Sequence, residues 1–131
     1  MGAVVLDTTV LIDLLRGRSG AVARLASLRS RGDLPYVCAV SAEEIARGIR
    51  PREEAGAELL LGALRSAPLG PADGWIAGEW RRRYAARGRI LTQADCLIAA
   101  AALTVGGRLA TGNPKDFPMP ELAVEHWPVG E

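Results

Sequence analysis

The feature that most constrains the fold of this chain is a short apolar run that ends in a charge. Residues 3–6 read AVVL, with no polar residue at alternate positions, and Asp7 follows directly. A strand without a polar face is typical of a parallel sheet that helices cover on both sides. We therefore expect a buried strand over residues 3–6 with an acid at its carboxyl end.

The rest of the chain alternates helix-like and strand-like patterns, within a length typical of one domain. Residues 96–105 are apolar on all sides, as in a helix at the centre of a domain. The sequence therefore predicts a single domain over residues 1–131, with an α/β/α sandwich fold and a mostly parallel central sheet. The expected helices cover residues 8–16, 20–32, 41–49, 51–66, 71–88 and 92–105, and the expected strands cover residues 3–6, 34–40, 108–111 and 122–127, with a short one within 66–70.

Composition and the first residues limit the setting of the protein. Sixteen Lys and Arg against fifteen Asp and Glu leave a formal net charge of +1, so no global field draws the chain to nucleic acid or to a membrane. The start MGAVVLD lacks a basic segment, and Asp7 and Asp13 interrupt its apolar stretch, which argues against a signal peptide or a membrane span. Cys38 and Cys96 lack metal-ligand spacing. We expect both cysteines to be buried and reduced in a cytoplasmic protein.

Four acids fall where a parallel sheet would gather them, because the carboxyl ends of its strands share one edge and ligands bind outside that edge. Asp7 ends the first strand, and Glu44 lies just after the second. Asp95 opens the apolar helix, and Asp116 follows the strand over 108–111. Asp7 most favours a functional role, since a carboxylate that ends a buried strand loses water and needs a partner.

The other three acids also have structural explanations. Ser41-x-x-Glu44 and Thr92-x-x-Asp95 both match the capping box, in which an acid reaches back to the amide of the residue that caps the helix. Asp116 suits the turn Asn-Pro-Lys-Asp. For Glu44 or Asp95 taken singly, capping is the favoured explanation.

The four acids together indicate a metal site. Carboxylates that converge in one crevice repel one another, and each resists ionisation unless a cation lies among them. Oxygen ligands without His or Cys favour a hard ion, Mg²⁺ or Mn²⁺, that retains waters and meets substrate phosphates. The pattern therefore predicts a divalent cation at this edge of the sheet.

Four segments in this order resemble the PIN-domain ribonucleases, in particular the small toxins of bacterial VapBC-type toxin–antitoxin pairs. They are VVLDTTVLIDLLRG, SAEEIARGI, LTQADCLIAAAAL and LATGNPKDF, which together span nearly the whole chain. The resemblance implies an endoribonuclease that hydrolyses RNA with a metal-activated water. It also implies a cognate antitoxin protein and a homodimer as partners.

Carried over by position, the resemblance implies specific residues. Glu44 is chosen over Glu43 because Gly48 follows it in the spacing E-x-x-x-G, and Glu43 stays an alternative. Hydroxyl and amide groups next to the acids would orient these metal ligands or their waters. The implied catalytic and metal-binding acids are Asp7, Glu44, Asp95 and Asp116, and the implied supporting residues are Thr9, Thr111 and Asn113.

Other interpretations stay open. A signalling receiver domain would also gather acids around Mg²⁺, although this chain lacks an acidic pair after its first strand. A PIN-like module that only binds a partner is a further alternative. The run WRRRYAAR (80–87) with Arg89 could contact RNA phosphates, but a solvated helix face with Trp80 and Tyr84 in the core is favoured. Asp13 is expected to be solvated or salt-bridged.

Overall fold

The computed structural model describes residues 2–131, and its centre is one five-stranded sheet. The strand order is β3-β2-β1-β4-β5, and every neighbouring pair is parallel. The expected parallel sheet is therefore confirmed. The strands are β1 (Ala3–Leu6), β2 (Leu34–Cys38), β3 (Arg65–Ala67), β4 (Arg108–Thr111) and β5 (Val124–His126).

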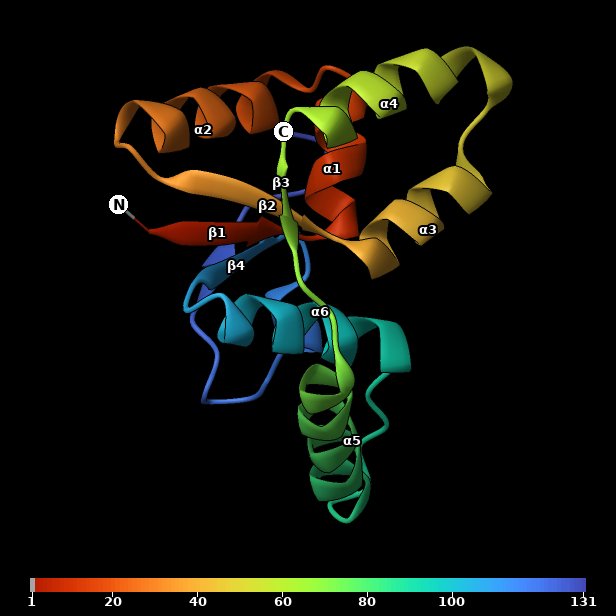
Figure 1. Ribbon diagram of the computed structural model, residues 1–131, viewed down its shortest axis with the longest axis vertical. Coiled ribbons are helices and arrows are strands. Elements are labelled where there is room, and N and C mark those ends of the chain that lie inside the picture. Colours follow the sequence, from red (N-terminus) through yellow and green to blue (C-terminus); the bar gives the residue numbers. More distant parts are fainter. Residues whose placement is uncertain (1) are drawn as a thin grey trace.

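Helices cover both faces of this sheet, which confirms the α/β/α sandwich. Four of them, α1 to α4, lie on one side, and α5 and α6 lie on the other, with α5 extending away from the sheet (Figure 1). The helices are α1 (Thr8–Leu15), α2 (Ser19–Ser30), α3 (Ala39–Gly48), α4 (Glu54–Gly62), α5 (Pro71–Ala85) and α6 (Gln93–Thr104), with 3-10 turns η1 (Pro51–Glu53) and η2 (Pro114–Asp116). Among residues 2–131, none of these helices combines the length and apolar character needed to cross a bilayer.

The apolar run at the start of the chain forms the middle of the core. Val4 and Leu6 pack toward α1 to α4, and Val5 between them packs toward α5 and α6. All three side chains are completely buried. Both faces of β1 are therefore covered, which is why this strand needs no polar position.

The alanine-rich helix α6 lies directly against the sheet on its second face. Residues 98–102 are fully buried, and small side chains at most of these positions let the helix approach both the sheet and α5. Trp80 and Tyr84 of α5 are buried beside it, as the favoured interpretation of the run 80–87 expects. Cys38 and Cys96 are buried and free, as predicted.

The strand order places a topological switch point between β1 and β4. From β1 the chain first builds outward through β2 and β3, and then returns to add β4 and β5 on the other side. Ligands of open α/β sheets bind at such a point, outside the carboxyl ends of the strands. Receiver domains have the order 2-1-3-4-5 instead. The observed order argues against the receiver interpretation and directs attention to the residues after β1 and β4.

Two polar side chains, Ser41 and Asp13, do not lie as predicted. The strand expected over 34–40 ends at Cys38, so the helix begins at Ala39 and Ser41 lies within its first turn. Ser41 therefore caps nothing. Asp13 is buried rather than solvated, because its carboxylate accepts a 2.8 Å hydrogen bond from the backbone N–H of Gly130.

Candidate functional site

Asp7 lies at the switch point, and its carboxylate accepts hydrogen bonds from three residues. Its backbone N–H donates to the carbonyl of Ala110 on β4, and its side chain caps α1 by accepting the Thr8 N–H at 2.8 Å. The hydroxyls of Thr111 and Thr9 donate to its other carboxylate oxygen at 2.7 and 3.2 Å. Burial raises the pKa of Asp7, and these hydrogen bonds act in the opposite direction. Asp7 is thus the N-cap of α1.

The supporting hydroxyls are themselves held by the loop after β4. Thr9 Oγ1 accepts the N–H of Gly112 at 2.9 Å, and Thr111 Oγ1 accepts the N–H of Asn113 at 3.0 Å. Each hydroxyl must therefore point its own hydrogen toward Asp7. Thr9, Thr111 and Asn113 form one network around this acid, and Asn113 enters it through its backbone.

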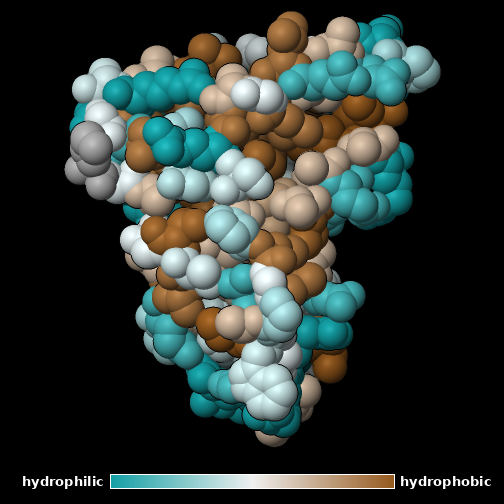
Figure 2. Space-filling view, in the orientation of Figure 1, coloured by the Kyte–Doolittle hydropathy of each residue, from teal (hydrophilic) through white to brown (hydrophobic). Residues whose placement is uncertain are grey.

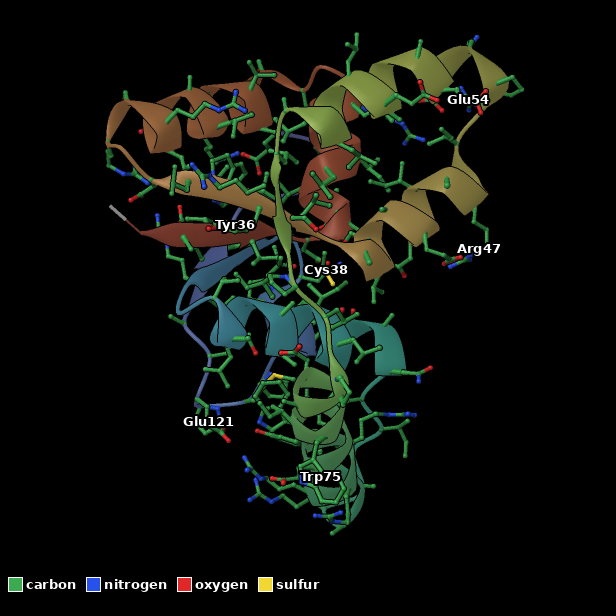
Figure 3. All side chains as sticks on the ribbon, in the orientation of Figure 1. Tyr36, Cys38, Arg47, Glu54, Trp75 and Glu121 are labelled. Carbon is green, nitrogen blue, oxygen red and sulfur yellow. The ribbon has the colours of Figure 1, made fainter. Side chains whose placement is uncertain are left out.

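Glu44 and Glu43 have different environments on α3. The Thr8 hydroxyl donates to Glu44 at 2.7 Å, so Glu44 is joined to the start of α1 beside Asp7. Glu43 pairs with Arg47, one turn further along α3, at 3.0 Å, and both side chains are exposed. Figure 3 shows Arg47 on the outer side of this helix. Because α3 starts before Ser41, Glu44 is also free of the capping role that the sequence offered.

Asp95 lies in the first turn of α6, where its backbone N–H donates to the capping hydroxyl of Thr92 at 3.1 Å. The helix cap therefore uses the amide of Asp95. Burial, together with the smaller effect of the negative charges of Asp7, Asp116 and Glu44, raises the pKa of its carboxyl to about 6. All four acids thus share one electrostatic environment.

Asp116 reaches this environment from η2. Its N–H donates to the carbonyl of Asn113 at 3.0 Å, which closes the turn predicted for Asn-Pro-Lys-Asp. The neighbouring carbonyl of Lys115 accepts a hydrogen bond from the Arg89 guanidinium. The turn fixes the position of Asp116, and the negative charge of Asp116 contributes to the raised pKa of Asp95.

The oxygen-only set of carboxylates and hydroxyls suits a hard divalent cation. In residues 2–131, however, no three His, Cys, Asp or Glu side chains are arranged to hold one ion. Asp7 and Glu44 are instead directed to threonine hydroxyls. The acids therefore lie in one region and repel one another, but they do not form a coordination shell.

A cavity of about 380 Å³ opens beside Glu44, between the first turns of α3 and α6. Its polar lining is contributed by Glu43, Arg47 and Gln93, and its apolar lining includes Val40 and Leu97. Of the four acids, only Glu44 also lines this cavity, so the cavity gives solvent and a ligand access to Glu44.

Thr8 is the residue of this site that sequence analysis missed. Thr8 links Glu44 to the first turn of α1, although the motif DTT drew attention only to Thr9. The signal available was the hydroxyl directly after the strand-ending acid. Its partner could not be predicted, because that depends on how α3 packs against α1.

The sequence model of the PIN domain family matches residues 4–119. Ribonuclease VapC19 of Mycobacterium tuberculosis is 34% identical over 118 residues, which cover 89% of this chain and 94% of that protein. Ribonuclease VapC10 of the same organism is 36% identical over 116 residues, which cover 88% and 86%. A chain in the crystal structure of VapBC2 from Rickettsia felis, bound to a promoter DNA fragment, has the same fold, with a TM-score of 0.82 at 18% identity over 95% of this chain and 98% of that one. From its sequence and its fold, this chain belongs to the PIN domain family.

Proposed function

We propose that this chain is a metal-dependent endoribonuclease and the toxin of a toxin–antitoxin pair. The observation that carries the proposal is that Asp95 lies within electrostatic reach of Asp7, Glu44 and Asp116 at the switch point of the sheet. Two relatives that match nearly the whole chain are named ribonucleases. The proposed substrate is therefore RNA.

Asp7, Glu44, Asp95 and Asp116 would hold Mg²⁺ or Mn²⁺, since oxygen ligands and mutual repulsion both favour a hard cation there. Such an ion lowers the pKa of a coordinated water and offsets the charge of the phosphate and of the leaving oxygen. The threonine hydroxyls fix the orientation of Asp7 and favour its ionised form. Glu43 is assigned no role in the chemistry, because Arg47 neutralises it.

Mapping the cleavage of total RNA tests this proposal. The wild-type protein, Asp7→Asn and Asp95→Asn are incubated with RNA and Mg²⁺ or Mn²⁺, with EDTA as a control. Specific cuts by the wild type alone, lost in EDTA, are the expected result. Equal cutting by all three proteins would refute the catalytic role of the acids.

A non-catalytic, partner-binding module is the second candidate. It is favoured by the acids' present arrangement, in which no three of them are placed for one ion. The same experiment separates the candidates, because a binding module cuts no RNA with either metal.

We further propose that the antitoxin occupies a groove between α3 and α4. Several solved structures of this fold are VapBC or other toxin–antitoxin complexes. The groove encloses about 290 Å³, and Ile45, Ile49 and Leu61 supply apolar walls. Figure 2 shows hydrophobic side chains gathered between these two helices.

Co-purification with the antitoxin tests the groove. Leu61→Asp should abolish it, because the change places a charge in the apolar lining. Leu59→Asp is the matched control, since the Leu59 side chain on the same helix is exposed and lies outside the groove. Equal co-purification of both variants would contradict the assignment. We also propose a homodimer, which light scattering of the purified protein would detect as twice the chain mass.

A further inference from the structure

The side chain of Arg89 contacts the backbone of Lys115 beside the acid cluster. The guanidinium of Arg89, from the segment between α5 and α6, donates to the carbonyl of Lys115 on η2. Lys115 directly precedes Asp116, and the segment that carries Arg89 leads into the first turn of α6, where Asp95 lies. One hydrogen bond therefore joins the two segments that deliver two of the four acids.

The segment around Arg89 is held firmly in place. The backbone N–H of Arg89 donates to the carbonyl of Tyr84 at 2.9 Å. The turn between these residues includes Gly88, which has a φ of +80°. Arg81 Nε donates to the carbonyl of Leu91 at 3.1 Å. A ligand of Arg89 would therefore meet a preorganised cation, and little conformational entropy would be lost on binding.

The charges of both residues are available to a ligand. Of the ion pairs formed within residues 2–131, none includes Arg89 or Lys115, whereas Arg47, Arg83 and Arg108 are each paired with an acid. Arg89 and Lys115 are both exposed. The contact with the Lys115 carbonyl occupies one of the five guanidinium donors, which leaves others for an incoming anion.

The apolar surroundings distinguish a nucleotide from a free anion. The side chain of Ile90, next to Arg89, is 80% exposed. An aliphatic side chain beside a cation suits contact with a ribose or a base attached to the phosphate, and adds nothing for inorganic phosphate.

We propose that Arg89 and Lys115 form a phosphate subsite that holds the RNA strand at a nucleotide next to the scissile bond. The inference rests on the proposed ribonuclease function, and it assigns these residues to substrate binding. The two cations would offset the repulsion between the strand and the four acids, and the Arg89 hydrogen bond holds the two residues next to each other.

The test measures RNA binding separately from cleavage. An Asp7→Asn background limits cutting, and fluorescence anisotropy follows a labelled single-stranded oligonucleotide in Mg²⁺ over a range of salt concentrations. Arg89→Ala and Lys115→Gln should each weaken binding roughly fivefold, the loss of one exposed charge-assisted contact. Each should also make the slope of log K against log salt shallower by about 0.7, the value for one phosphate contact of a single strand. Inorganic phosphate should compete poorly.

Arg29→Ala is the matched control. This exposed arginine lies in the last turn of α2, which leads into the start of β2 at the opposite edge of the sheet. Its replacement should change neither affinity nor slope. An equal loss in Arg29→Ala would contradict a specific subsite, as would unchanged slopes in both Arg89→Ala and Lys115→Gln.

Lys115→Gln also guards against a purely structural effect. Removing the Arg89 guanidinium frees the Lys115 carbonyl and could displace the turn that carries Asp116, whereas Lys115→Gln removes a charge and no backbone contact. A shallower slope in Arg89→Ala alone, with a lowered melting temperature, would overturn the subsite. If the wild type cuts no RNA while the salt slopes of Arg89→Ala and Lys115→Gln both become shallower by about 0.7, the nuclease proposal fails and the subsite stands. If the wild type cuts RNA and both slopes stay unchanged, only the subsite fails.

Discussion

The hydroxyl of Thr111 donates a 2.7 Å hydrogen bond to the carboxylate of Asp7, across the boundary between β4 and β1. The two residues terminate or follow neighbouring parallel strands, and both are buried. This contact joins the two halves of the sheet at its switch point. It therefore connects the order of the strands with the chemistry proposed at their carboxyl edge.

Replacing Thr111 should harm both stability and activity. Thr111→Val removes the donor to Asp7 and leaves the N–H of Asn113 without its acceptor, which should cost about 1–3 kcal/mol in the free energy of unfolding. Thr111→Ser retains the hydroxyl and should recover most of the RNA cleavage. Urea unfolding and a cleavage assay measure the two effects. Equal activity of the Val and Ser variants would show that the hydroxyl is not needed.

The neighbouring acids of α3 should differ in their effect on cleavage. Glu44→Gln should lower the rate at least roughly tenfold, because even groups behind a metal ligand contribute 10–100-fold to affinity or activity. Glu43→Gln should leave the rate nearly unchanged, since Glu43 forms an exposed pair with Arg47. Initial rates under identical metal concentrations provide the comparison. The reverse order of the two variants would assign the role to Glu43.

Asp95 should make the metal-free protein less stable as the pH rises. Its pKa is raised from 3.8 to about 6 by folding, so between these values the folded chain keeps a proton that the unfolded chain releases. The free energy of unfolding therefore falls through this window, by about 1–2 kcal/mol for a half-buried group. Asp95→Asn should match the wild type near pH 4 and exceed it above pH 6, in EDTA. Thermal melts across this range would contradict the account if the two curves stayed parallel.

The close approach of β4 to β1 should depend on Gly107. A Cβ at this position would lie 2.4 Å from the backbone oxygen of Ala3, where the backbone cannot yield easily. Gly107→Ala should therefore destabilise the protein by about 1–3 kcal/mol. Gly62→Ala, at the end of α4 with open space around it, is the control and should have little effect. Similar melting temperatures for both variants would argue against this close contact.

Much of the fold follows from local patterns in the sequence. The polar-free run 3–6 predicted a strand covered on both faces, and the apolar helix after Thr92 predicted an element in the core. These predictions succeeded because a segment that is buried on all sides is apolar at every position, whereas an exposed segment has a polar face. The common carboxyl edge of the strands also followed, since it requires only parallel strands.

Contacts between segments that are far apart in the chain could not be predicted from the sequence. The start of α3 was misplaced because Ala39 and Val40 fit a strand as well as a helix, and the sheet pairing that ends at Cys38 decides between them. The burial of Asp13 was not predicted, because its hydrogen-bond partner, the N–H of Gly130, is far from it in the sequence. The link between Arg89 and Lys115 depends in the same way on how two loops pack.

Mn²⁺ binding, measured by isothermal titration calorimetry on the metal-free protein, tests the central claim most directly. The account predicts saturable binding to the wild type and to Glu43→Gln. It predicts binding at least roughly tenfold weaker in Asp7→Asn, Glu44→Gln, Asp95→Asn and Asp116→Asn. Equal binding by the wild type and these four variants, or no binding by the wild type, would contradict a cation shared by the four acids.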